Sequence, residues 1–159
     1  MEIKGLIDED FSNYRLPSMF VIMPYCTFKC EKESGVRCCQ NSALARQRVL
    51  TISPDDIIKR YCENDITKAI VFGGLEPMDS FDDLEQFVQY FRNKYHRDDT
   101  IVIYTGYNPS EIATQITLLE PYRNIIIKFG RYIPNATPRY DEVLGVELAS
   151  NNQFAMRIS

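Results

Sequence analysis

The chain has 159 residues, a length that predicts one domain over residues 1–159 with enough buried surface for its own core. Apolar residues make up 45% and charged residues 25%, proportions that exclude a disordered tail, a collagen-like repeat and a coiled coil. The net charge of −4 argues against binding nucleic acid through its phosphates, and no apolar run is long enough to span a membrane. Because the first residues are too acidic for a secretory signal, we expect a cytoplasmic protein.

The first half of the chain predicts a strand, a loop and two helices. Residues 18–24 are apolar and β-branched, which is typical of a buried strand. Four cysteines follow in a stretch that contains a glycine and is predicted as a loop, with a short helix after it at residues 41–47. Ser53 and Pro54 then begin a longer helix, because serine caps free amides and proline suits the first helical position.

The second half of the chain continues the alternation. Buried strands are predicted at residues 68–72, 101–104 and 124–129, and a short final strand at residues 156–159. Ser80, three residues before Asp83, predicts a capped helix after the first of these strands. Asn108 predicts another after the second.

Strands that are apolar on both faces and separated by helices predict an α/β fold with a parallel sheet. In such sheets the ligand site lies beyond the carboxyl ends of the strands. Four segments occupy those ends: the cysteine loop, residues 73–77 (GGLEP), residues 105–107 (TGY) and residues 129–132 (FGRY). We therefore expect these four segments to converge in space.

The cysteines indicate a metal or cluster site. Five cysteines in a chain without a secretory signal argue against a disulfide framework, and four of them lie within fourteen residues: Cys26, Cys30, Cys38 and Cys39. Four thiolates could hold zinc, although adjacent cysteines suit one small ion poorly; three could hold a 4Fe-4S cluster with one iron left open. Cys62 is predicted to be a small buried apolar residue, and His96 to be exposed to solvent.

Together these motifs resemble the radical S-adenosylmethionine (SAM) superfamily. The resemblance rests on Cys-x₃-Cys with a later cysteine after the first strand, and on a GGEP-like motif after the second. Cys39-Gln40-Asn41, Tyr104-Thr105-Gly106-Tyr107, Phe129-Gly130-Arg131-Tyr132 and Ser150-Asn151-Asn152-Gln153 are similar to segments of the activating proteins of anaerobic ribonucleoside-triphosphate reductase. The matches run in the same order from about residue 18 to the end.

The chain departs from the pattern of the superfamily at three places. The usual spacing is C-x₃-C-x₂-C, whereas here seven residues separate Cys30 from Cys38. Either Cys38 or Cys39 could be the third ligand, and we favour Cys39 because Gln40-Asn41 then takes the place of the Tyr-Asn of the family. The GGEP-like motif contains an extra leucine, and Phe129 stands where the family has aspartate.

The resemblance implies an open, partial (β/α) barrel and a set of cofactor-binding residues. Cys26, Cys30 and Cys39 would hold the 4Fe-4S cluster. Gly73 and Gly74 would let the backbone approach the methionine part of SAM, since glycine has no Cβ atom. Three further residues would contact SAM. Glu76 would accept a hydrogen bond from its ammonium group, Thr105 would bond to it from the end of the third strand, and Phe28 would pack near its adenine.

The resemblance also implies an activity and its partners. The protein would be an oxidoreductase that cleaves SAM reductively to a 5′-deoxyadenosyl radical and makes a glycyl radical on a partner enzyme, the anaerobic ribonucleotide reductase. An electron donor such as flavodoxin or ferredoxin would be needed, and neither nucleic acid nor membrane would be a partner. Two alternatives remain: a radical SAM enzyme that modifies another protein or peptide, and a non-catalytic α/β binding module stabilised by a metal.

Overall fold

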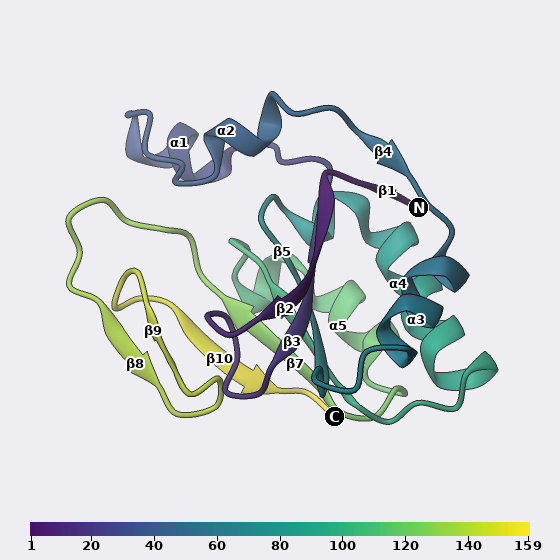
Figure 1. Ribbon diagram of the computed structural model, residues 1–159. Coiled ribbons are helices and arrows are strands. Elements are labelled where there is room, and N and C mark those ends of the chain that lie inside the picture. The colour runs from purple at the N-terminus through teal and green to yellow at the C-terminus, as the bar shows by residue number, and fades with distance from the viewer.

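The computed structural model describes residues 1–159 and builds them around a six-stranded sheet with the order β10-β7-β6-β5-β3-β2 (Figure 1). The strands are β2 (Gly5–Asp10), β3 (Ser18–Ile22), β5 (Ala69–Gly73), β6 (Thr100–Tyr104), β7 (Ile125–Phe129) and β10 (Phe154–Arg157). The four central strands are parallel, and antiparallel β2 and β10 form the two edges. The predicted mixed α/β fold with a mainly parallel sheet is confirmed, while closure into a partial barrel stays a prediction.

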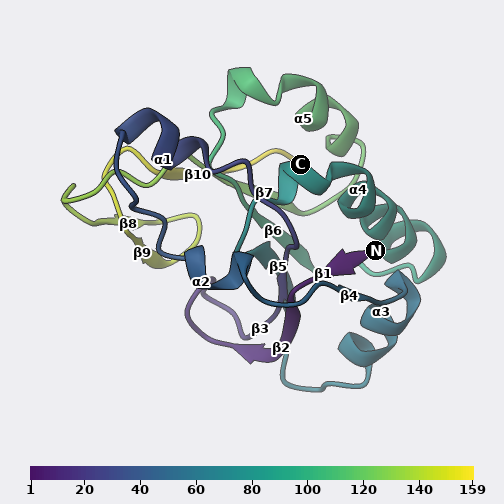
Figure 2. The same cartoon turned by 90° about the horizontal axis from the view of Figure 1, so that it is seen from above.

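Three helices cover one face of this sheet (Figure 2): α3 (Pro54–Cys62), α4 (Phe81–Gln89) and α5 (Ala113–Leu119). They share a face because the central strands follow one another in chain order and parallel crossovers are right-handed. Side chains such as Met19, Phe72 and Phe87 form the larger core of 21 buried residues there. At 25 cal/mol per Å², each such side chain contributes about 2 kcal/mol on burial.

The opposite face carries a thinner layer made of α1 (Lys29–Ser34), α2 (Ser42–Ala45) and a hairpin of β8 (Arg139–Asp141) and β9 (Val146–Leu148) (Figure 2). Alternate residues of each strand point to this face, and a smaller core of seven buried residues packs beneath the hairpin. This face is less completely filled, and it contains the site described below.

Short elements complete the chain. They are β1 (Glu2–Ile3), which pairs with β4 (Leu50–Thr51), the 3₁₀ turns η1 (Pro77–Ser80) and η3 (Pro109–Glu111), and one π-helical turn, η2 (Tyr90–Lys94). None of the helices is both long and apolar enough to cross a membrane.

Several local predictions can be compared with the structure. The Ser53 hydroxyl accepts a hydrogen bond from the Asp56 backbone N–H at 3.1 Å, which confirms that helix start. Ser80 makes no such bond, because the chain enters α4 through the η1 turn. The predicted cysteine loop contains α1, and the predicted final strand lies two residues earlier, as β10. Cys62 was predicted to be buried and is exposed, because it lies at the end of α3 beyond the face that packs on the sheet.

Candidate cofactor site

A cavity of about 560 Å³ lies at the carboxyl ends of the parallel strands, on the face opposite α3, α4 and α5. Its lining draws on all four of the strand-end segments that the sequence predicted would converge, including Cys26, Glu76, Thr105 and Arg131. The size is within the range of pockets for small molecules and cofactors.

Three cysteines line this cavity: Cys26, Cys30 and Cys39. All three thiols are half-buried, and burial is the main cause that raises the pKa of Cys26 to about 12 and that of Cys30 to about 11. The negative charges of Cys39 and Cys38 would raise the pKa of Cys30 further, so these side chains are near neighbours. No group of three or more His, Cys, Asp or Glu side chains is close enough in the structure to hold a single metal ion.

Cys38 faces a different environment from Cys39. Its sulfur lies 3.4 Å from the Ser34 hydroxyl oxygen and outside the cavity lining. The Cys39 backbone N–H donates instead to the Glu31 carboxylate at 3.1 Å, a bond that fixes this residue against α1. The cavity thus contains Cys39 and not its neighbour.

Backbone geometry shapes the start of the cysteine segment. Phe28 has a φ of +53° and precedes α1, and its N–H donates to the Cys26 sulfur at 3.2 Å. Gly35 ends α1 with a φ of +71°, a conformation that glycine adopts without strain. Cys30 therefore lies in the first turn of a helix with a defined beginning and end.

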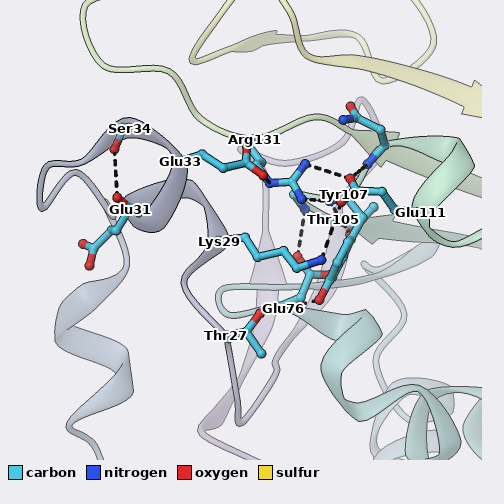
Figure 3. Close-up of polar contacts among 12 residues, drawn as sticks. Thr27, Lys29, Glu31, Glu33, Ser34, Glu76, Thr105, Tyr107, Glu111 and Arg131 are labelled. Carbon is cyan, nitrogen blue, oxygen red and sulfur yellow. Dashed lines mark hydrogen bonds and ion pairs between the residues drawn. The ribbon is translucent and has the colours of Figure 1, made fainter.

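Glu76 lies at the centre of a hydrogen-bond network at the base of the cavity (Figure 3). Its carboxylate accepts bonds from the Thr105 hydroxyl at 2.6 Å, the Gly106 N–H at 2.8 Å and the Met78 N–H at 3.1 Å. Burial raises the pKa of Glu76, and these three bonds oppose the rise. A carboxylate has about four acceptor positions, so one remains for another donor.

The Thr105 hydroxyl makes two hydrogen bonds within the protein. It donates to Glu76 and accepts the Tyr107 N–H at 3.0 Å. Thr105 is 1% exposed, so its part in the site is to orient Glu76 and the 105–107 turn.

The two glycines of the GGLEP motif have different surroundings. A Cβ atom on Gly74 would lie 2.8 Å from the Ile22 side chain, and its φ of +80° favours glycine in any case. A Cβ atom on Gly73 would lie 3.1 Å from the Phe20 ring. Gly74 lines the cavity, whereas Gly73 and Phe28 do not.

A buried lysine also lines the cavity. Lys128 of β7 is 6% exposed and its ammonium donates to the Gly130 carbonyl at 3.0 Å. Burial lowers the pKa of Lys128 to about 8, and the nearby Glu76 carboxylate acts in the opposite direction. The ammonium has three N–H groups and one acceptor in the protein, so donors remain for a ligand.

Charged side chains connect the cysteine helix to the rim of the cavity (Figure 3). Arg131 donates to both carboxylate oxygens of Glu111, at 2.6 and 2.7 Å, and its Nε lies 3.1 Å from a Glu33 oxygen of α1. Lys29, also in α1, lies 3.5 Å from Glu111 and 4.3 Å from the centre of the Tyr107 ring.

Sequence reasoning did not select Lys128, Arg131 or Glu111 as site residues. Lys128 carried a usable signal, because it is the one charged residue in the apolar run 125–129, next to a strand end. Arg131 belongs to the motif at residues 129–132 (FGRY) but had no predicted role. Glu111 had none, because its pairing with Arg131 joins segments twenty residues apart.

The fold and the cysteine-lined cavity define an α/β domain that can hold an iron–sulfur cluster. The family described as "4Fe-4S single cluster domain" matches residues 15–151, so the chain belongs to that family. Neither the curated proteins nor the solved structures include a match.

The residues present fit such a cluster. Thiolates are the ligands that 4Fe-4S clusters use, and three thiols line one cavity here. Cluster binding would require these thiols to lose their protons, so assembly at the cavity would release protons to solvent.

Proposed function

We propose that this protein is a radical SAM activase: it uses its 4Fe-4S cluster to cleave SAM and generates a glycyl radical on a partner enzyme, the anaerobic ribonucleoside-triphosphate reductase. The observation that carries the proposal is the convergence of three cysteines with Gly74, Glu76 and the 105–107 turn around one cavity. The resemblance of these segments to the radical SAM superfamily, in order along the chain, supplies the reaction.

The bound group would supply the chemistry: one electron from the reduced cluster splits a C–S bond of SAM to methionine and a 5′-deoxyadenosyl radical, which takes the Cα hydrogen of a partner's glycine. The residues of the chain bind and orient. Cys26, Cys30 and Cys39 would hold the cluster, which leaves one iron open. Glu76 would accept a hydrogen bond from the SAM ammonium through its free acceptor position.

The remaining predicted residues would act at a distance. Thr105 would position Glu76 through their 2.6 Å hydrogen bond. Gly74 would keep the backbone close to the ligand, and Phe28 would fix Cys26 through its N–H. Gly73 would leave space for the Phe20 ring beneath the cavity.

The first test compares two adjacent cysteines after anaerobic reconstitution. We expect the wild-type chain and Cys38→Ser to bind about four irons per chain, and Cys39→Ser to lose the cluster. Dithionite and SAM should then yield 5′-deoxyadenosine from the first two proteins only. Loss of iron from Cys38→Ser with retention in Cys39→Ser would contradict the ligand assignment.

The second test addresses the partner. Addition of the anaerobic reductase should produce a glycyl radical signal in electron paramagnetic resonance. A cluster that cleaves SAM but leaves the reductase without a radical would favour modification of another protein or peptide. Stoichiometric zinc, or a cluster that never cleaves SAM, would refute the activase and favour a binding module.

A further inference from the structure

The positive charge of the chain is concentrated beside the candidate cluster. Residues 29–48, called here the α1–α2 segment, contain five of the 18 basic residues and two of the 22 acidic residues. The remaining residues therefore carry 13 basic and 20 acidic side chains. A net positive segment of this kind lies within a chain whose net charge is −4.

Most of these cations are free to meet a partner. Lys32, Arg37, Arg46 and Arg48 are exposed, and none of them forms an ion pair within the chain. Lys29 differs, because it already pairs with Glu111 at the cavity rim. Exposed cations without partners create a local positive potential that attracts an acidic surface.

The α1–α2 segment also forms part of the wall of the site. Neither α1 nor α2 contains a buried residue, and both lie apart from the sheet, on the side away from α3, α4 and α5 (Figures 1 and 2). Cys30 and Cys39 belong to this segment and face the cavity from it. A partner on its outer surface would be separated from the cluster by a single layer of chain.

We propose that the outer surface of the α1–α2 segment is the docking site for a low-potential electron carrier with an acidic surface. The proposal rests on the proposed function, since SAM cleavage consumes one electron per turn. The carrier is oxidised by one electron and the cluster is reduced by one, so no other reactant is required. The inner side of the segment remains available to SAM and the partner's glycine.

An acidic protein fits this surface better than a nucleic acid. A compact protein can place its carboxylates over the four free cations alone. A nucleic acid would extend past them, along a chain in which 20 acidic residues outnumber 13 basic ones outside the segment. Such repulsion offsets the counterion release on which nucleic-acid binding depends.

The test measures cluster reduction in the reconstituted holoprotein by stopped-flow absorbance. The carrier is flavodoxin hydroquinone, and the variant is Arg46→Glu with Arg48→Glu. The matched control is Lys59→Glu with Arg123→Glu, which changes the net charge equally. Lys59 is exposed on α3, and Arg123, 80% exposed and paired with Asp98, precedes β7 at its amino end, away from the carboxyl ends of the strands where the cavity lies. Iron content and circular dichroism should be unchanged in both variants.

At low salt we expect the second-order rate constant for reduction to fall roughly tenfold or more in the Arg46/Arg48 variant and less than about twofold in the control. At about 1 M salt the difference should disappear, because the screening length shortens to about 3 Å. Reduction by photoexcited deazaflavin, which needs no protein contact, should be equal in all three proteins.

Other outcomes would overturn the proposal. These are equal rates in the two variants, an effect that salt does not remove, and a wild-type cluster that deazaflavin reduces but flavodoxin does not. Weaker binding of the glycine-bearing partner with unchanged reduction would assign the surface to that partner instead. SAM cleavage is scored separately under deazaflavin, so a chain that accepts electrons here but never cleaves SAM refutes the proposed function alone.

Discussion

Replacing Glu111 with glutamine tests the charged contacts between the cysteine helix and the cavity rim. Glutamine retains one carbonyl oxygen, so only one of the two Arg131 N–H groups keeps an acceptor, and the other faces an amide NH₂ group. Arg131 is 9% exposed and cannot exchange that lost acceptor for bulk water. The substitution preserves the size and shape of the side chain.

The structure gives the magnitude. The Glu111 carboxylate accepts hydrogen bonds from Arg131 and from the Asn108 N–H. These bonds lower the pKa of Glu111 from 4.5 to about 2, and those from Arg131 have the larger effect. At 1.36 kcal/mol per pKa unit this corresponds to about 3 kcal/mol. The Glu111 side chain is 29% exposed, so solvent screening reduces the expected loss of stability to about 1–2 kcal/mol.

The assay is urea-induced unfolding of the reduced, metal-free chain, followed by circular dichroism. Because the carboxyl pKa is lower in the folded state, its contribution is present above about pH 4.5 and is lost as the pH falls toward 2. The difference between wild type and Glu111→Gln should therefore shrink over that range. Glu120→Gln, at an exposed residue with no side-chain hydrogen bond, is the control. A loss below about 0.3 kcal/mol at neutral pH, or one that persists in acid, would refute the reasoning.

Two further substitutions test the base of the cavity. Gly74→Ala should lower the free energy of unfolding by about 2–4 kcal/mol, because backbone strain at φ +80° adds to a 2.8 Å approach to the Ile22 side chain. The control is Gly35→Ala, whose Cβ atom would meet no atom within 4 Å, and it should lower the free energy of unfolding by only about 1 kcal/mol. Similar losses in the two variants would contradict the steric argument. Lys128→Met should stabilise the chain by about 1–3 kcal/mol below pH 8, because it removes a buried ammonium whose pKa is lowered to about 8. That gain should decline to zero as the pH rises to about 10.5, and a gain independent of pH would show that packing, not charge, is responsible.

The central strands could be predicted because they are buried on both faces. Residues 124–129, for example, were predicted as a strand because residues 125–129 are apolar apart from Lys128, and β7 covers Ile125–Phe129. Edge strand β2 could not be predicted, because its sequence GLIDED is half acidic and it is a strand only through its pairing with β3. The β8–β9 hairpin was not predicted for a similar reason, because its strands are three residues long and half exposed.

The sequence indicated candidate residues that belong to local motifs and missed those that act through distant pairing. The cysteines and Glu76 were selected because their spacing from strand ends places them in one region, and the cavity contains them. Thr105 was selected as a ligand contact, but its hydroxyl is bound to Glu76, which only three-dimensional structure can reveal. The sequence favoured Cys39 over Cys38 through the Gln40-Asn41 match, but the different surroundings of the two thiols depend on α1, a helix that the sequence did not indicate.

The absence of buried residues in α1 and α2 has a consequence for how the protein matures. Segments with few buried apolar contacts open locally at a free energy well below that of global unfolding. The sheet, with its core of 21 buried residues, can therefore fold first and remain folded while residues 29–48 open and close. Iron and sulfide would enter by that route, and amide hydrogen exchange in this segment should slow sharply once the cluster is in place.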